Sequence, residues 1–360
     1  MSVLSAADPS SRALGLSRNL LVCIGLLILL ATVALLSLTH GAAQISVARV
    51  WTILLRLFTL QPGDASSDSL IVLTIRLPRL ILSMLIGGAL GISGALMQGL
   101  FGNPLADPGL VGVSSGAGAA GTAAIVLGDR FEILGLGVSS FSVLPLAAFV
   151  GALAMTVMLY AIATRRGRTS VASMLLAGVA LGALASAFTG ILAYISDDRQ
   201  LRDLTFWSMG SLGGATWIKV ALLGPVVVAL LAAAPFLARG LNALALGEAE
   251  AFHLGVRVQR LKGAVILLVA LAVGTSVAAA GAISFVGIVA PHVLRLLIGP
   301  NHRALLPFSV MIGATILASA DLFARTLAAP AEMPIGILTA AIGAPFFLWL
   351  LLRRDLKALE

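Results

Sequence analysis

Charge is scarce in this sequence: only 11% of the 360 residues are charged, whereas 59% are hydrophobic, and the mean hydropathy is +1.08. Ordinary soluble domains carry about a quarter charged residues. A soluble chain of this size could not hide so much apolar surface, because even a large core leaves much of the chain at its boundary. The composition therefore excludes a soluble globular protein and predicts that the lipid bilayer is the solvent.

The sequence also lacks the residue patterns of common enzyme and metal sites. Its single cysteine, Cys23, excludes an intrachain disulfide. The four histidines show no metal-ligand spacing, and no lysine follows a glycine as the phosphate-binding loop G-x-x-x-x-G-K-S/T requires. We therefore expect a chain that is not an enzyme and that binds no metal and no cofactor of its own. Active transport by such a chain would need energy from a partner.

Acidic residues are missing from the centres of the apolar segments. An ion-coupled transporter normally carries Asp, Glu or His in mid-membrane, because coupling a cation needs a titratable or coordinating group there. Here Asp321 lies toward the outer end of its segment, and Arg76 and Arg79 lie at the outer start of theirs. This pattern argues against a secondary transporter or proton pump, which stays open only if backbone carbonyls at broken helices build the ion site.

Long apolar runs fill most of the chain. The run Leu20–Leu38 exceeds the apolar stretch of about 7–15 residues in a secretory signal and can span a bilayer. The runs predict ten transmembrane helices, near 20–38, 70–99, 108–127, 140–163, 171–194, 215–238, 262–281, 283–298, 304–324 and 335–352. The run at 283–298 is short for a full crossing. We expect an all-α membrane protein with one transmembrane domain over 19–353 and short tails at 1–18 and 354–360.

The basic residues set the expected orientation. With the N-terminus in the cytoplasm, the whole formal excess of +8 falls in cytoplasmic segments, as the positive-inside bias requires. An even number of spans then places the C-terminus in the cytoplasm as well. The net positive charge is thus explained by membrane topology, and we expect no nucleic-acid partner.

Two cytoplasmic loops break the pattern of short connections. The loop 239–262 predicts two short helices, Leu241–Leu246 and Glu248–Leu254, which are separated by Gly247 and closed by Gly255 as a C′ glycine. It is either a solvated loop helix or a docking element for a cytoplasmic protein, and its apolar face favours docking. The second loop, 103–109, predicts a rigid, proline-bounded turn.

The outer ends of two segments carry arginines. Arg76 and Arg79 are three residues apart at a helix start and therefore lie on nearly the same face, and Arg325 lies just beyond another outer helix end. Such residues either anchor the helix in lipid headgroups or bind a partner. Arginine is disfavoured on the outer side of a membrane, which favours the binding role.

Short motifs spread in order along the chain resemble a known family. They are RLPR at 76–79, GISGALMQ at 91–98, NPLADPG at 103–109, LLAGVALG at 175–182, WSMG at 207–210, GAISFVG at 281–287, PHVLR at 291–295, MPIG at 333–336 and GAPFF at 343–347. From about residue 70 to its end, the chain resembles the ten-helix permeases of ATP-binding-cassette (ABC) importers for iron-siderophores, heme and cobalamin. The resemblance implies the type II importer fold of the cobalamin permeases.

The resemblance also implies partners: a second copy of this chain, two ATPase subunits that bind ATP in the cytoplasm, and a substrate-binding protein in the periplasm. The family's coupling loop, which sits in a cleft of the ATPase, matches Glu248, Glu250, His253, Leu254 and Gly255. Positions that line the family's cytoplasmic gates match Asn103, Leu105, Thr169 and Ser170. Positions whose arginines pair with acidic residues of the binding protein match Arg76, Arg79 and Arg325.

The segment 197–207 (DDRQLRDLTFW) looks most like the heme-importing branch of that family. We therefore expect import of heme across the bacterial inner membrane, with heme as the transported substrate. A ferric siderophore is the first alternative and cobalamin the second, because similar apolar walls would pass all three.

Overall fold

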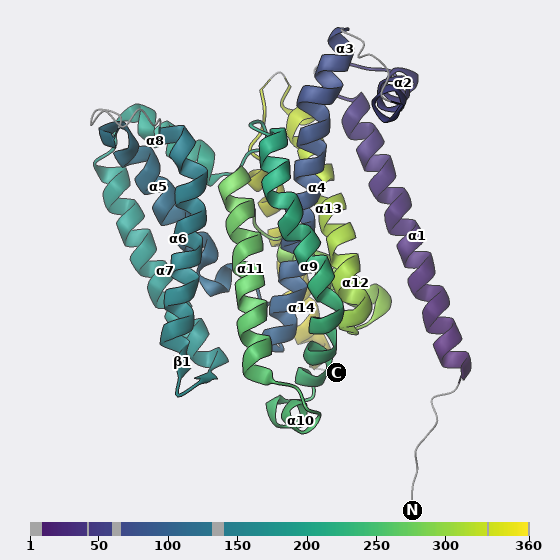
Figure 1. The fold of residues 1–360 in the computed structure, drawn as a ribbon, viewed down its shortest axis with the longest axis vertical. Coiled ribbons are helices and arrows are strands. Elements are labelled where there is room, and N and C mark those ends of the chain that lie inside the picture. Colours follow the sequence, from purple (N-terminus) through teal and green to yellow (C-terminus); the bar gives the residue numbers. More distant parts are fainter. Residues whose placement is uncertain (1–8, 42, 60–65, 132–139, 330, 359–360) are drawn as a thin grey trace, which may run out of the picture.

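The structure, a computed structural model, describes residues 9–41, 43–59, 66–131, 140–329 and 331–358. It is a bundle of long helices that run side by side between two ends (Figure 1). Helix α1 (Pro9–Thr39) lies at one edge of the bundle, and α5 (Val113–Phe131), α6 (Ser140–Ala163) and α7 (Val171–Tyr194) form the opposite edge.

The remaining elements complete the bundle and its two ends. They are α2 (Val47–Phe58), α3 (Ser67–Leu70), the π-helical turn η1 (Ile71–Arg76), α4 (Leu77–Phe101), the 3-10 turn η2 (Pro108–Val111), β1 (Thr164–Arg165), β2 (Arg168–Thr169), α8 (Asp198–Ser208), α9 (Trp217–Leu244), α10 (Glu248–His253), α11 (Val258–Ala280), α12 (Val286–Ile298), α13 (His302–Leu327) and α14 (Ile335–Ala358).

The predicted all-α membrane fold is confirmed. Among the described residues, 7 helical stretches are long and apolar enough to cross a membrane, and shorter apolar helices lie at Val113–Gly128, Val286–Ile298 and Ile335–Trp349. Together they occupy the positions of the ten predicted spans. The short run predicted near 283–298 is α12, which has 13 residues and begins after Phe285, a residue with a positive φ of 68°.

Three helices differ from the expectation. Helices α2 and α8 were not predicted, because α2 has only 12 residues and α8 is both short and polar. Helix α9 continues through Leu244, so the separate short helix predicted at Leu241–Leu246 is wrong. Gly240 does not end α9 but packs against the side chain of Leu261, and the Leu and Ala residues that follow it favour helix continuation.

Helix α4 lies at the centre of the bundle. In the stretch Ser67–Phe101, 83% of the most apolar window is buried inside the chain. A Cβ atom added to α4 at Gly87, Gly91 or Gly94 would collide with backbone oxygens of α13 or α12. Glycine at these positions lets helix backbones touch. These close crossings hold α4 in place, and the two ends of α4 carry the arginines and the 103–109 turn.

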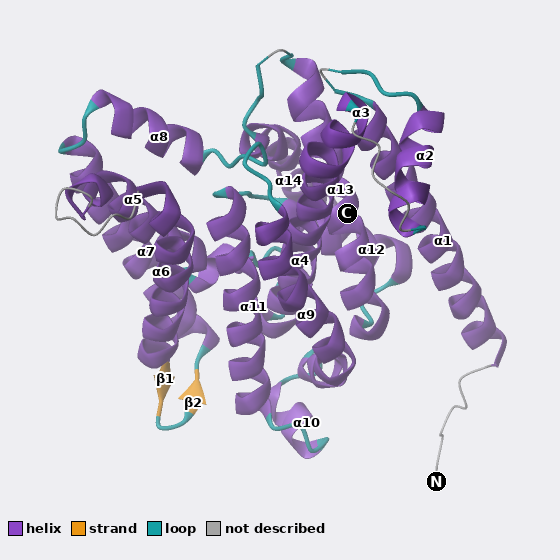
Figure 2. Cartoon of the chain, turned by 45° about the horizontal axis from the view of Figure 1, so that its top comes forward, coloured by secondary structure: helices purple, strands orange, loops and turns teal. Residues whose placement is uncertain are grey.

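The two ends of the bundle differ in what they carry. Helices α2, α3 and α8 lie at one end, which we call the α8 end (Figures 1 and 2). Helix α10, the β1–β2 hairpin and the start of α1 lie at the other, the α10 end. The hairpin turns through Arg166 and Gly167, with φ of 50° and 74°, the pair of positive angles that a tight two-residue hairpin loop requires.

Candidate functional site

The loop between α9 and α11 folds into one short helix with defined ends. Gly247, at φ 121°, precedes α10, and Gly255, at φ 80°, follows it. The Gly255 N–H donates to the Phe252 carbonyl at 2.9 Å, and the Val256 N–H donates to the Ala251 carbonyl at 3.0 Å. These two bonds form the Schellman ending that a C′ glycine permits, so the predicted role of Gly255 as a helix terminator is confirmed.

Helix α10 and the residues that flank it expose apolar side chains. Leu246, Phe252 and Leu254 are 66%, 72% and 64% exposed. An exposed apolar group of this kind, rimmed by charge, marks a contact surface. The adjoining pocket is lined by Arg168, Glu248, Ala249, Phe252, His253, Arg257, Val258, Gln259 and Arg260. We call this surface, together with Leu246 and Leu254, the α10 face.

A buried lysine joins α10 to the hairpin. Lys262 Nζ donates to Glu248 Oε1 at 2.6 Å and to the Thr169 carbonyl at 2.7 Å. Three residues earlier on α11, Gln259 Oε1 accepts from the Thr169 N–H at 2.8 Å. Ser170, the residue after Thr169, caps α7 with its side chain. The structure thus links Thr169 and Ser170 of the predicted gate to the predicted coupling loop.

The other two predicted gate residues lie in the turn after α4. Asn103 Oδ1 accepts from the Leu105 N–H at 2.9 Å, and Asp107 Oδ1 accepts from the Gly109 N–H at 2.6 Å. Such side-chain-to-backbone bonds pre-form a turn. Burial raises the pKa of the Asp107 carboxyl, and the bond from the Gly109 N–H opposes that rise. The predicted rigid turn is therefore present and is held by local bonds.

At the α8 end, Arg79 bridges two carboxylates from different parts of the chain. Its Nε and Nη2 lie 3.0 Å and 2.9 Å from Asp321 Oδ1, and its Nη1 lies 2.8 Å from Glu332 Oε1. The Asp321 side chain is only 1% exposed, whereas that of Glu332 is 49% exposed. The planar fork of arginine suits two such partners at once. This group ties α4 to α13 and to the segment before α14.

Arg76 and Arg325 hold the connection between α1 and α2. Arg76 Nη1 donates to the Leu38 carbonyl at 2.6 Å, and its Nη2 donates to the Ala43 carbonyl. Arg325 Nη2 donates to the Ser37 carbonyl and hydroxyl at 2.5 Å and 2.7 Å. Carbonyls at a helix end have no partner within the helix, and here the two arginines supply one.

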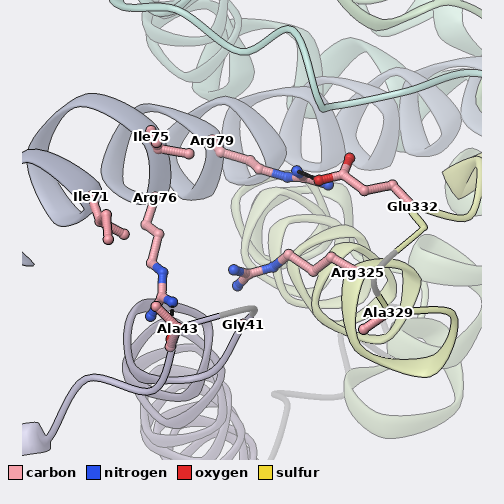
Figure 3. A pocket seen from close by; sticks show the side chains of 9 residues that line it. All are labelled: Gly41, Ala43, Ile71, Ile75, Arg76, Arg79, Arg325, Ala329 and Glu332. Carbon is pink, nitrogen blue, oxygen red and sulfur yellow. Dashed lines mark hydrogen bonds and ion pairs between the residues drawn. The ribbon is translucent and has the colours of Figure 1, made fainter.

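The three predicted docking arginines line one pocket, and Figure 3 shows them around it with Glu332. We call it the arginine pocket. Arg76 and Arg79 are only 5% and 8% exposed, and all three guanidinium groups donate within the chain. The structure brings the predicted residues together, but as the wall of a pocket and not as free side chains.

The sequence interpretation missed the contacts that the three arginines and Lys262 make within the chain. Asp321 and Arg325 are four residues apart on α13, a spacing that places both on one helix face. Gln259 and Lys262 are three apart on α11 and likewise share a face. Those spacings were the available signals, whereas Glu332 gave none.

A bundle of apolar helices long enough to cross a membrane, with an exposed short helix at one end and a charged pocket at the other, defines a multi-span membrane protein. The comparisons give the particular class. The chain belongs to the FecCD transport family, which matches residues 2–353, and it is the permease of an ABC importer.

Similar proteins cover nearly the whole chain. The hemin transport system permease protein HmuU of Yersinia pestis is 44% identical over 331 residues, which are 91% of this chain and 94% of that protein. The cobalamin import system permease protein BtuC of Halobacterium salinarum is 43% identical over 323 residues, 89% and 84% of the two chains. A solved inward-facing structure of a transporter assigned to the metal-chelate type is 33% identical, with a TM-score of 0.79, and covers 92% of this chain and 98% of its own.

Proposed function

We propose that this permease carries heme from the periplasm to the cytoplasm. The observation that carries the proposal is the segment 197–207, which resembles the heme-importing branch of the family. The relative named for hemin transport, 44% identical to this chain, supports it. Relatives named for cobalamin import reach 42–44% identity, so cobalamin is the second candidate.

The proposed heme segment forms a well-defined helix at the α8 end. Asp197 and Gln200 cap each other reciprocally at the start of α8, and Trp207 packs against Gly121 of α5. This anchoring leaves Leu201 and Phe206 39% and 57% exposed. Exposed apolar side chains on a fixed helix suit a flat, largely apolar macrocycle.

Two cations on the same helix match the rest of the heme molecule. Arg199 and Arg202 are exposed and three residues apart on α8, so they lie on nearly one face. Heme carries two carboxylates, and arginine binds carboxylates strongly through charge-assisted hydrogen bonds. We propose that these arginines receive the carboxylates of heme at the entrance.

We further propose an assembly of two copies of this chain with two ATPase subunits. The α10 face supports docking of an ATPase on each copy. For the second copy, helix α7 offers an apolar face, because only 17% of its membrane window is buried inside the chain. The apolar residues that α7 leaves exposed include Leu176, Val179, Leu184 and Ile191.

The orientation and the outer partner complete the proposal. The exposed Arg165, Arg166 and Arg168 of the hairpin lie at the α10 end, and basic loops favour the cytoplasmic side. The bacterial inner membrane would then hold the chain with both termini in the cytoplasm. A periplasmic binding protein would dock at the α8 end, near the arginine pocket formed by Arg76, Arg79 and Arg325.

Transport in liposomes tests the substrate. The permease is reconstituted with its ATPase and binding protein, and uptake of hemin, a ferric siderophore and cobalamin is measured with ATP or with an ion gradient alone. We expect hemin to accumulate and to stimulate ATP hydrolysis, and an ion gradient alone to drive no uptake. Uptake of cobalamin or the siderophore without hemin would overturn the heme proposal.

A double substitution tests the entrance. Arg199→Gln with Arg202→Gln should raise the hemin concentration for half-maximal uptake about tenfold, because charge-assisted bonds to the carboxylates are lost. Uptake by Arg303→Gln, which removes an exposed cation at the start of α13, at the opposite end of the bundle, is the control and should be unchanged. Equal uptake by the double variant and the control would contradict a role of α8 in heme entry.

A further inference from the structure

We infer that Lys262 transmits displacement of α10 to the β1–β2 hairpin and to the start of α7, and is thus a positioning residue for transport. The inference rests on the proposed docking of the ATPase on the α10 face. It concerns three elements that one ammonium group brings together: α10 through Glu248, α11 through its own backbone, and β2 through Thr169.

Because Lys262 is buried, its charge depends on the groups that pair with it. The residue is 1% exposed, in the first turns of an apolar helix. A buried ammonium group is costly unless it is paired and hydrogen-bonded. Its ion-pair partner, Glu248, has a side chain that is 54% exposed and begins α10 at the proposed docking surface. A partner that moves α10 therefore changes the pairing of a charge inside the bundle.

On the receiving side, Thr169 is held at both of its backbone groups. Its N–H donates to Gln259 and its carbonyl accepts from Lys262, at 2.8 Å and 2.7 Å. The hydroxyls of Thr164 and Thr169 pair across the hairpin at 2.9 Å. Since Ser170 follows directly and caps α7, a shift of Thr169 reaches both the hairpin and α7.

The ends of α10 are the points where it can tilt. Gly247 and Gly255 both have positive φ and connect α10 to α9 and α11. Changes at such element-terminal residues absorb the backbone rotation of a rigid-body movement. Within α10 the buried ammonium group pairs with Glu248, the first residue of the helix, so Lys262 would follow that end of α10 if the helix tilts.

Hydrogen–deuterium exchange in the whole complex tests the inference. The permease, ATPase and binding protein are assembled in nanodiscs, and exchange of residues 164–175 and 246–256 is compared with and without ATP. Lys262→Met keeps a long, unbranched side chain and removes the ammonium group. Lys219→Met is the matched control, because Lys219 Nζ donates to the Ala279 carbonyl at 2.9 Å without joining α10 or the hairpin.

In the wild type and in Lys219→Met, ATP should alter exchange in both segments. In Lys262→Met the response of 246–256 should remain, while the response of 164–175 and the substrate moved per ATP should each fall about tenfold, a typical coupling magnitude. Glu248→Ala, a substitution at an exposed side chain, should show the same pattern if Lys262→Met does not fold.

The outcomes separate the two hypotheses. An unchanged hairpin response in Lys262→Met and Glu248→Ala, with α10 still responding, would overturn the role of Lys262 and leave ATPase docking intact. A lower unfolding temperature with an intact hairpin response would likewise show that Lys262 only stabilises the fold. No response of 246–256 in the wild type would overturn docking on α10 and the inference with it.

Discussion

The two ends of this permease use charge in opposite ways. At the α8 end, three arginines and two carboxylates make contacts within the chain, and Arg79 and Asp321 are almost completely buried. At the α10 end, one lysine is buried and its carboxylate partner is half exposed. Both ends expose apolar side chains, among them Phe206 at the α8 end and Phe252 and Leu254 at the α10 end.

The difference indicates which end is built to keep its shape. Buried ion pairs and arginine-to-carbonyl bonds fix α1, α4 and α13 relative to one another, because removing any one partner leaves an uncompensated polar group. The α10 end instead has a helix between two glycines with positive φ. We therefore expect substitutions to affect stability at the α8 end and coupling at the α10 end.

The largest effect on stability is expected from Arg79→Met. It leaves the buried carboxylate of Asp321 without its bidentate partner, and breaking a buried pair costs about 3–5 kcal/mol. The unfolding free energy in detergent, or the midpoint of thermal unfolding, measures the loss. Arg79→Met combined with Asp321→Leu should recover part of it, because both charges are then absent.

A surface carboxylate gives the control for this comparison. Glu250→Gln on the exposed side of α10 should change stability by no more than about 0.5 kcal/mol. Equal destabilisation by Arg79→Met and Glu250→Gln would show that the α8 end is not the more rigid of the two.

The largest effect on transport is expected from Gly255→Pro. Proline fixes φ near −65° and has no N–H, whereas Gly255 has φ 80° and donates to Phe252. The α10 face should lose its shape while the bundle stays folded, and ATP-driven uptake should fall about tenfold or more. Uptake and binding of the ATPase are the measurements.

Gly255→Asn is the matched variant, because asparagine tolerates the left-handed conformation and keeps the N–H. It should retain most of the uptake that Gly255→Pro loses. Normal assembly and transport by Gly255→Pro would mean that α10 is not the docking element.

The fold could be predicted from the sequence to the extent that the bilayer imposes it. A span needs about 20 apolar residues whatever its neighbours are, so the ten spans followed from local runs. Helix α8 was missed because a polar surface helix has no such signature. The end of α9 was misplaced because the apolar run was taken to end at 238, before Arg239, whereas the contact of Gly240 with Leu261 depends on a helix elsewhere in the sequence.

In the candidate site, too, local features could be predicted from the sequence and long-range contacts could not. The role of Gly255 as a helix terminator was predictable because it depends on the conformation of one residue. The partners of Arg79 and Lys262 were not, since Glu332 lies 253 residues from Arg79 and Thr169 lies 93 residues from Lys262. Contacts at such separations are set by packing of α4, α11 and α13, and no short motif carries them.

A smaller effect tests whether the arginine pocket also serves docking. Glu332→Gln keeps an acceptor for Arg79 but removes the half-exposed negative charge from the pocket. If an acidic partner docks there, its association rate should rise about twofold at low salt, because rim charges act mainly on association. The difference should shrink as salt screens it.

The binding protein's association with the permease in nanodiscs measures this rate. Glu250→Gln makes the same charge change at the opposite end and should leave the rate unchanged. Identical rates for wild type, Glu332→Gln and Glu250→Gln would leave the three arginines with the role of holding α1 and α13 in place.

The smallest effect is expected from Asp107→Asn in the turn after α4. Burial raises the pKa of the Asp107 carboxyl in the folded protein. Its stability contribution is therefore fully present below the pKa of the unfolded chain and is lost as pH rises through the folded pKa. Asparagine stays neutral at every pH and keeps an Oδ1 acceptor for the Gly109 N–H, so the variant should match wild type in acid and exceed it by about 0.5 kcal/mol near neutral pH. Thermal unfolding across this pH range measures the difference.

Asp198→Asn is the control with the opposite sign, because a carboxylate at the exposed start of α8 stabilises the positive end of a helix dipole. A difference between Asp107→Asn and wild type that does not grow with pH would show that the charge of the partly buried Asp107 carries no cost, and that its bond to Gly109 alone determines its effect.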